Sequence, residues 1–451
     1  MKRTATKIAI PIALLTLILV LIARPHNPTI NIESTSDSYS IAIQPQFAWV
    51  GTFSDGLAVA AQDGAWGINL RHRHTPWRFG VIDTEGNWVV RPQFYGINPF
   101  SDGVAGVRFA IEDEGNWGVI DRQGNVIVPA RYDFVDTFSE GMAVVGFRIP
   151  HENWMQASWL TGYINANGVE IVPPQFDRAM PFTNGLGVVF LDGMAGAVNR
   201  EGELVIPLEF DWICVFVDGL APARKNGRAG FIDTSGQWAF PLKFDSSDGF
   251  SEGLAAVLID GLWGFIDTTG EMVIPPQFDQ AARFSDGIAR VMVNYSWGLI
   301  DTTGAFTVAP RFGPHFGNTP AHTGEDGAEY LPTTLDIAGD YRNGLVPLME
   351  FVPVGPGSGT SGGWGAMDRY GRIVIPVIYD FIYYFDDGYV RVSQHMDRGV
   401  LHGIMDITGT MVVAPRFSLL GVPSEGLAAV EVYPENGGRP RWGFIRFHPS
   451  S

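Results

Sequence analysis

Three short sequence elements recur in the same order along almost the whole chain, and this internal repeat limits the fold more than any other feature. The first is an aromatic residue followed by Ser, an acidic residue and Gly, as in residues 250–253. The second is a Trp-Gly pair, as in 263–264, and the third is a proline shortly before an aromatic ring, as in 276–278. Each element occurs ten times, and from Phe182 to Phe284 the first returns every 34 residues. Such a period predicts similar structural units that stack on each other.

One unit has the pattern of three short strands separated by turns. Between residues 253 and 274, three segments are rich in Val, Ile, Leu and aromatic side chains, and none has the apolar spacing of a helix. Asp267 and Gly270 predict a tight turn, because aspartate accepts backbone N–H groups and glycine tolerates a positive φ. Pro275 is predicted to end the third strand, since proline donates no ladder hydrogen bond. The Trp-Gly pair predicts a large ring over the core, beside a position that a neighbouring backbone approaches too closely for a Cβ.

The chain resembles the bacterial WG-repeat (KWG) family, named for its Trp-Gly pair, with about ten degenerate copies over residues 43–446. The best matches are the units around Trp117, Trp263 and Trp297. Weaker copies replace the tryptophan, by Phe79, Thr161, Ala195, Ala229 and His402. The resemblance implies an architecture of repeated β-units. It implies no catalytic residues and no ligand, because the family has no catalytic residues common to its members and no agreed ligand.

Three strands cannot bury both faces of a small sheet, so the units must pack on each other. We expect an all-β tandem array of three-stranded repeats of about 34 residues, extended or superhelically coiled. The alternative is one or two propeller-like closed rings, although ten three-stranded units differ from the usual 4–8 four-stranded blades. The array has a first part at residues 43–312 and a second part at 341–446. A long insertion loop at 313–340 separates them, and a Gly/Ser-rich linker lies at 355–363.

The N-terminus has the pattern of an export signal. Three basic residues among the first seven precede an apolar run at residues 8–23. This run is 16 residues long, slightly short of the ~20 that span a bilayer. We expect residues 1–24 to be an uncleaved signal-anchor and 25–42 to be a linker; the alternatives are a cleaved signal peptide, which would give a secreted protein, and a buried helix. The positive-inside rule then places the repeats outside the cytoplasm.

Charge and cysteine content exclude several classes of function. The formal net charge is −18, and removing the four cations of the first 24 residues leaves 26 basic and 48 acidic residues, a net charge of −22. Such a chain cannot hold nucleic acid through phosphate contacts, and its charge disfavours anionic lipid. A single cysteine, Cys214, excludes a disulfide framework and a Cys-rich metal site.

Recurrent acidic residues are the first candidates for a metal site. Asp or Asn followed three residues later by Gly occurs nine times at the second turn, and an aspartate follows the third element six times. Calcium needs several oxygen ligands in one short loop, and each of these turns offers one, so we interpret them as residues that bind nearby backbone. His72 and His74 lie at i and i+2 with no third ligand nearby in sequence, which is typical of a hairpin tip. We predict no metal and no cofactor.

Aromatic residues outside the repeat template are candidates for a binding surface, because rings at the fixed positions are expected in the core. Residues with this property include Trp77, Trp154, Trp159, Trp212, Tyr383 and Tyr384. We name Trp77, Trp154 and Trp159 as the possible binding surface. The 313–340 loop is a second candidate, since long loops in compact proteins are often functional. The sequence has no nucleophile elbow, phosphate loop, zinc-protease motif or dinucleotide fingerprint, so we predict no enzymatic activity.

Together these features predict a membrane-anchored, extracytoplasmic WG-repeat protein that acts as a non-enzymatic scaffold for protein–protein interaction. Its partner is expected to be another envelope protein, with no nucleic acid, and its membrane contact is expected through residues 8–23. The alternative is a cell-wall or glycan-binding module that uses the off-template tryptophans. A third hypothesis is an enzyme with its site on the 313–340 loop.

Overall fold

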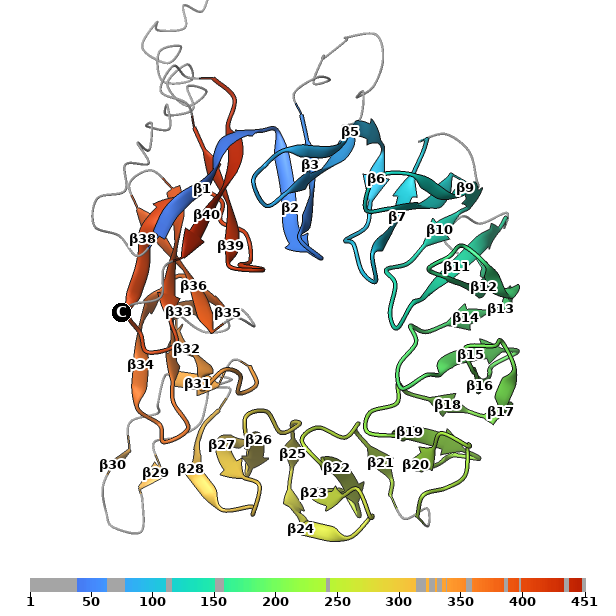
Figure 1. Ribbon diagram of the computed structural model, residues 1–451. Coiled ribbons are helices and arrows are strands. Elements are labelled where there is room, and N and C mark those ends of the chain that lie inside the picture. The colour runs from blue at the N-terminus through green and yellow to red at the C-terminus, as the bar shows by residue number, and fades with distance from the viewer. Residues whose placement is uncertain are drawn as a thin grey trace, which may run out of the picture.

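The computed structural model consists of small antiparallel sheets, ten of which stand side by side in a closed ring (Figure 1). This is the arrangement of a β-propeller, and we number the ten sheets as blades in chain order. The structure describes residues 39–62, 78–110, 116–150, 158–240, 244–313, 322–323, 329–330, 335–337, 339–353, 359–384, 388–396, 399–433 and 438–447. These ranges contain strands and turns, and no helix.

The first five blades follow each other along the first half of the chain. Blade 1 has β2 (Trp49–Ser54), β3 (Leu57–Ala61), β4 (Phe79–Asp83) and β5 (Trp88–Phe94), and blade 2 has β6 (Gly96–Ile97), β7 (Val104–Arg108), β8 (Trp117–Asp121) and β9 (Val126–Tyr132). Blade 3 has β10 (Phe134–Val135), β11 (Met142–Ile149), β12 (Ser158–Asn165) and β13 (Glu170–Phe176). Blade 4 has β14 (Arg178–Ala179), β15 (Gly187–Leu191), β16 (Met194–Val198) and β17 (Leu204–Phe210), and blade 5 has β18 (Trp212–Ile213), β19 (Leu220–Lys225) and β20 (Arg228–Asp233).

The other five blades complete the ring. Blade 6 has β21 (Ser246–Ser247), β22 (Leu254–Ile259), β23 (Leu262–Asp267) and β24 (Met272–Phe278), and blade 7 has β25 (Gln280–Ala281), β26 (Ile288–Val293), β27 (Ser296–Asp301) and β28 (Phe306–Phe312). Blade 8 has β31 (Leu335–Ile337), β32 (Val346–Pro353), β33 (Gly359–Met367) and β34 (Ile373–Tyr379), and blade 9 has β35 (Phe381–Tyr384), β36 (Tyr389–Met396), β37 (Gly399–Asp406) and β38 (Met411–Phe417). Blade 10 has β39 (Leu427–Val432), β40 (Arg441–Phe447) and β1 (Tyr39–Phe47), and β29 (His322–Thr323) pairs with β30 (Glu329–Tyr330) outside the ring.

Within a blade, the chain passes from the innermost strand to the outermost (Figure 1). The innermost strand is only two residues long in six blades, and the prediction of three strands per repeat missed it. The outermost strand continues through Pro275 and Pro276 to Phe278, so the prediction that Pro275 ends it was wrong. The ladder is irregular between Ile274 and Phe278, and this strand has a free edge, so the prolines remove no necessary hydrogen bond.

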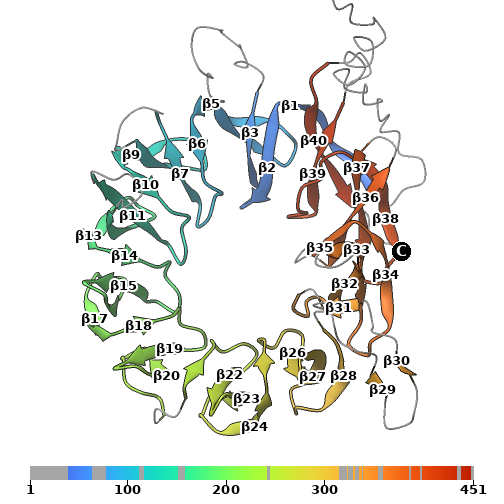
Figure 2. The ribbon, with the colours of Figure 1, turned by 180° about the vertical axis from the view of Figure 1, so that it is seen from behind.

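The N-terminal strand closes the ring. β1 pairs antiparallel with β40, from Tyr39 opposite Phe447 to Phe47 opposite Trp442 (Figure 2). It is the outermost strand of blade 10, whose other strands come from the far end of the chain. The all-β repeat fold predicted from the sequence is confirmed. Of the two arrangements considered, the structure has the closed ring in place of the extended array, because the two ends of the array pair with each other.

The apolar core lies between neighbouring blades. Phe265 of blade 6 and Phe284 of blade 7 are both fully buried, with ring centroids 4.8 Å apart. Blades 7 and 8 share a core in the same way, where Val308 and Leu348 belong to one buried cluster. The core is therefore continuous across the 313–340 insertion, and residues 335–337 of that insertion form the innermost strand of blade 8.

The Trp-Gly pair lies where the third and outermost strands come together. A Cβ on Gly264 would lie 2.6 Å from the carbonyl oxygen of Ile274 and 2.7 Å from the nitrogen of Pro276. Trp263 is opposite Phe278 and packs against the core between blades 6 and 7. The predicted arrangement, a large ring over the core beside a glycine that a backbone approaches, is confirmed in this unit.

The predicted membrane segment, residues 8–23, and the rest of the 1–38 region lie outside the described residues. Within the part that is described, no helix is long and apolar enough to cross a bilayer.

Substitution of Gly264 tests the close approach. We expect Gly264→Ala to lower the free energy of unfolding by about 3 kcal/mol, since the added methyl group overpacks against backbone that has little room to move. Gly249→Ala is the control, because its Cβ would meet only the flexible Arg283 side chain, at 3.5 Å. Urea denaturation of both variants measures the difference, and equal midpoints would contradict the argument.

Candidate functional site

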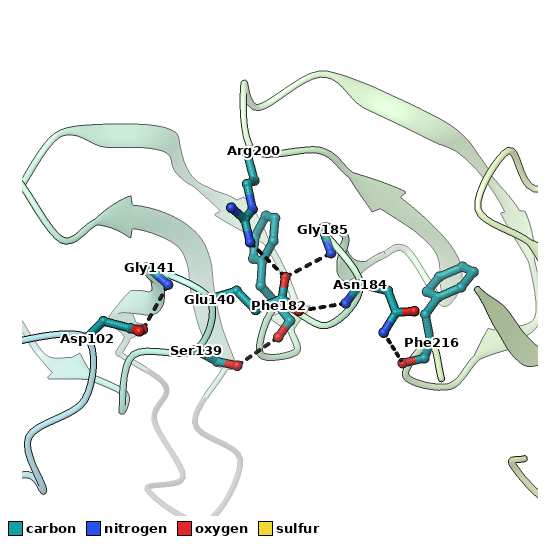
Figure 3. A network of polar contacts seen from close by, with 9 residues as sticks. All are labelled: Asp102, Ser139, Glu140, Gly141, Phe182, Asn184, Gly185, Arg200 and Phe216. Carbon is teal, nitrogen blue, oxygen red and sulfur yellow. Dashed lines mark hydrogen bonds and ion pairs between the residues drawn. The ribbon is translucent and has the colours of Figure 1, made fainter. Parts of the chain in front are cut away.

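An acidic or amide residue of the first turn joins one blade to the next at seven of the ten junctions. This turn connects the innermost strand to the second strand, toward the inner side of the ring (Figure 1). In blade 3, the two carboxylate oxygens of Glu140 accept the backbone N–H groups of Asn184 and Gly185 in blade 4, each at 2.8 Å (Figure 3). Seven junctions of the described chain have such a bond: Glu425 to Gly56, Asp55 to Gly103, Asp102 to Gly141, Glu140 to Gly185, Asn184 to Gly219, Glu252 to Gly287 and Asp286 to Gly344.

The serine of the same turn adds a second bond across the junction. Ser139 donates its hydroxyl to the carbonyl oxygen of Phe182 in the next blade at 2.8 Å (Figure 3). Arg200 reaches Glu140 from an outer turn of blade 4, at 3.1 Å. Burial raises the pKa of Glu140, but the hydrogen bonds from Gly185, Arg200 and Asn184 outweigh this effect and leave the pKa below its ordinary value. The turn acid is therefore a structural anion, held by backbone of the next blade.

The second family of acidic residues closes the hairpin between the third and outermost strands. Asp267 Oδ1 accepts three hydrogen bonds. The backbone N–H of Thr269 donates at 2.9 Å, the Thr269 hydroxyl at 2.6 Å, and the backbone N–H of Glu271 at 3.0 Å. The bond from the Thr269 hydroxyl is the main cause of the lowered pKa of Asp267. Thr303 has the same effect on the pKa of Asp301. These are the turns that the sequence predicts.

The third family follows the proline-aromatic element and fixes the turn between the second and third strands. Asp177 accepts the N–H of Asp192 at 2.8 Å, and Asp279 accepts that of Asn294 at 2.6 Å. The corresponding acceptors elsewhere are Asp133, Asp211, Asp245 and Asp380. All three families of repeated carboxylates thus bind main chain. Across the described ranges, no three His, Cys, Asp or Glu side chains are grouped as a metal site.

Blades 8 and 9 depart from the repeat through exposed apolar side chains. The residue before the aromatic ring of the third element is Gln, Glu, Arg or Lys in nine units, but it is Ile378 in blade 8, with 62% of its surface exposed. Phe381 and Tyr383 on β35 are each nearly half exposed, as are Met396 and Val400 beside the turn between β36 and β37. We call these five residues the blade 9 patch.

Ring contacts and backbone pairing hold the patch together. The Phe381 ring centroid lies 4.8 Å from that of Trp364 in blade 8 and 6.4 Å from that of Tyr383. The carboxylate of Asp380 accepts the N–H of His395, which keeps the turn that carries Met396 next to β35. Because consecutive strands are antiparallel, Met396 and Val400 are at the end of the blade opposite the Ser-acid-Gly and Asp-x-x-Gly turns, and the patch extends from there along β35 to Tyr383, which is opposite Arg391.

A cation lies against one ring of the patch. The guanidinium carbon of Arg391 is 5.1 Å from the centroid of the Tyr383 ring, and Arg391 also donates to the carbonyl oxygen of Leu420 in blade 10, at 2.8 Å. Burial lowers the pKa of Arg391, and the group stays charged because its ordinary value is far above neutrality. The patch therefore combines apolar area with one fixed, partly desolvated cation.

A Ser–His pair lies beside the patch. Ser393 Oγ is 2.8 Å from Nδ1 of His402, which occupies the tryptophan position of the repeat. Ser393 is only 4% exposed, and no carboxylate of the described residues is hydrogen-bonded to His402. Burial lowers the pKa of His402, and Arg391 adds to this effect. The Ser393 hydroxyl is buried, and no carboxylate of the described chain orients the His402 ring for proton transfer. We therefore interpret the pair as packing that fills the place of the tryptophan found in other repeats.

Comparison with known sequences agrees with the repeat. A sequence model described as WG containing repeat matches nine segments, at residues 40–66, 79–109, 117–146, 162–194, 196–228, 230–263, 263–296, 364–395 and 403–433. These segments cover more than half of the chain. The chain belongs to the WG-repeat family. None of the curated proteins compared with it matches.

Three solved structures are similar to this WG-repeat chain with TM-scores below 0.5. A eukaryotic initiation factor has 10% identity and a TM-score of 0.43, over 74% of this chain and 92% of that chain. The tricorn protease has 12% identity and a TM-score of 0.22, over 85% and 42%. Hsv2 from Kluyvelomyces marxianus has 10% identity and a TM-score of 0.27, over 68% and 93%.

Of the tryptophans named as the possible binding surface of this WG-repeat chain, the structure describes only Trp159. Trp77 and Trp154 lie outside the described residues, as do His72 and His74. Trp159 is half-buried on β12, with its ring edge-on to Phe134 at 5.0 Å. Of the patch residues, only Tyr383 is among the candidates that the sequence suggests. Comparison of each unit with the other nine, position by position, is the signal that could have found Ile378.

Removal of one first-turn acid tests the hydrogen bonds that join neighbouring blades. Glu252 accepts the N–H groups of Asp286 and Gly287, and we expect Glu252→Ala to lower the free energy of unfolding by about 1 kcal/mol. Glu271→Ala is the control, because its carboxylate makes no hydrogen bond to the described residues. Urea denaturation compares the two variants, and an equal loss in both would show that the bonds across the junction contribute nothing.

The Asp-x-x-Gly turns predict the response to acid. A carboxyl group whose folded pKa is lowered stabilises the fold fully above its unfolded pKa, and this stabilisation is lost as the pH falls through the folded value. The urea concentration at the unfolding midpoint should therefore decrease as the pH is lowered from about 5 to about 2. Asp267→Asn with Asp301→Asn, which copies Asn165 and Asn199, should flatten this dependence. An unchanged slope in the double variant would refute the assignment.

Proposed function

We propose that this WG-repeat propeller is a non-enzymatic scaffold that binds a partner protein through the blade 9 patch. One observation carries the proposal: the repeated polar side chains are engaged with main chain, whereas Ile378 and Tyr383 are exposed departures from the repeat, and Tyr383 lies beside the exposed ring of Phe381. Exposed apolar patches with polar rims are typical of protein interaction sites. Aromatic rings and arginine, as at Tyr383 and Arg391, are the side chains most enriched in such interfaces.

We further propose that the propeller is anchored to a membrane by residues 8–23 and lies outside the cytoplasm, so its partner is another envelope protein. The support is the order of the N-terminal sequence, with basic residues before an apolar run of 16. The net charge of −22 on the remaining chain favours a soluble surface that does not adhere to anionic polymers.

Site-specific cross-linking in intact cells tests the docking surface. A photoreactive phenylalanine analogue at Tyr383 should form one major adduct with a protein, and Ile378→Gln, which restores the residue of the repeat, should lower the yield about tenfold. The control position is Tyr295, which is 84% exposed on the turn between β26 and β27 of blade 7 and lies outside the patch. Equal adducts from both positions would contradict docking at the patch.

The same patch offers a test of the glycan alternative, because exposed aromatic rings also stack on sugars. The purified chain is centrifuged with cell-wall sacculi at low and high salt. A scaffold for proteins should stay in the supernatant at both salt concentrations. Retention that survives high salt and is lost in Phe381→Ser would favour a cell-wall or glycan-binding module instead.

A further inference from the structure

The Asp-x-x-Gly turns of blades 8 and 9 differ from the others at their tips. The two residues between Asp or Asn and Gly are polar in the other seven turns, apart from one alanine. In blade 8 they include Tyr370, which is 67% exposed, and in blade 9 they include Ile407, which is 38% exposed. Ile373 and Met411 follow these turns at a position that is apolar and exposed in blades 2, 4, 6 and 7 too, so only Tyr370 and Ile407 are peculiar to blades 8 and 9. We call these four residues the turn ridge.

The turn ridge is continuous with the point where the described chain begins. The backbone at Gly409 lies against Val374, so the turn of blade 9 packs directly on the residue after Ile373. Val412, the neighbour of Met411, belongs to the same buried cluster as Tyr39. The hydroxyl of Tyr39 also accepts a hydrogen bond from Arg416 of blade 9, at 2.8 Å. Tyr39 is thus fixed at the end of the ridge.

The length of chain between residues 8–23 and Tyr39 limits how far the turn ridge can lie from a membrane anchor formed by residues 8–23. Fifteen residues separate the apolar run at 8–23 from Tyr39. A chain of that length spans at most ~50 Å when fully extended, and about 20 Å on average if it behaves as a flexible coil. If residues 8–23 cross a bilayer, the end of the blades that carries Tyr39 and the turn ridge is the part of the propeller nearest the lipid.

We infer that the turn ridge lies in the lipid–water interface of the membrane that anchors the chain. This inference depends on the proposed anchoring. Tyrosine is enriched at membrane interfaces, where its ring contacts acyl chains and its hydroxyl stays wet. Isoleucine and methionine add apolar area to the same contact. The acidic chain gains little from anionic lipid, so the contact is apolar and needs no anionic headgroup.

The orientation that follows has a consequence for the partner. The turn ridge is at the end of blades 8 and 9 that carries the Asp-x-x-Gly turns, whereas Ile378, Met396 and Val400 of the blade 9 patch are at the opposite end. With the ridge on the lipid, this part of the patch faces away from the membrane, where another envelope protein can reach it.

Depth-dependent quenching in vesicles tests the inference on the full chain. The native cysteine is removed by Cys214→Ser, and single labelling sites are introduced by Tyr370→Cys and Ile407→Cys, with Tyr295→Cys as the control on the opposite end of blade 7. Each variant carries a nitrobenzoxadiazole fluorophore and is reconstituted into phosphatidylcholine vesicles with or without nitroxide-labelled lipid. We expect nitroxide lipid to lower the emission at positions 370 and 407 at least twofold and to leave that at 295 unchanged.

Flotation of the same samples separates the two proposals. Chain that floats with the vesicles, but shows as little quenching at 370 and 407 as at 295, would overturn the turn ridge as a membrane contact and leave the anchoring intact. Chain that does not float would remove the anchoring and the inference together. Thermal unfolding of each labelled variant confirms that the ring is formed, and a label introduced by Ile373→Cys repeats the test if one variant does not fold.

Discussion

A sheet of three or four short strands has two faces and little area, so a blade of this propeller is stable only between two neighbours. Every blade contributes apolar side chains to two clusters, as Phe265 and Phe284 do between blades 6 and 7. A linear array would leave one face bare at each end, whereas a ring leaves none. The pairing of β1 with β40 completes blade 10 and closes the ring, so it is the contact on which the burial of the two end faces depends.

The acidic composition of the chain follows from this architecture. Every blade needs three tight connections, and each connection leaves backbone N–H groups that no neighbouring strand can accept. Aspartate, glutamate and asparagine satisfy them, as Glu140 does between blades and Asp267 does within one. A carboxylate engaged in this way accepts several hydrogen bonds at once, and the backbone donors compensate for part of its desolvation. The net charge of −18 thus reflects turn chemistry repeated many times.

The sequence predicted the repeat, the strands, the Asp-x-x-Gly turns and the close approach at Gly264, because each of these depends on residues that recur. It missed the innermost strand, which is too short to have a hydrophobic period of its own. It also favoured an extended array, although the order of the elements indicated closure. The first copy of the proline-aromatic element, at Phe47, precedes any Trp-Gly pair, and the last Trp-Gly pair, at Trp442, has no such element after it. The last unit therefore lacks the proline-aromatic strand that the first segment of the chain supplies.

The candidate site could not be predicted in the same way, because a site in a repeat protein depends on residues that do not recur. Positions that bind the next blade are constrained in every unit, whereas an exposed position such as 378 or 370 can change in one unit without cost to the ring. An apolar side chain at such a position gains nothing from the fold, since it stays in water. Ile378 and Tyr370 are both of this kind, at opposite ends of blade 8. Their exposure is explained if each end of the blade contacts a different surface.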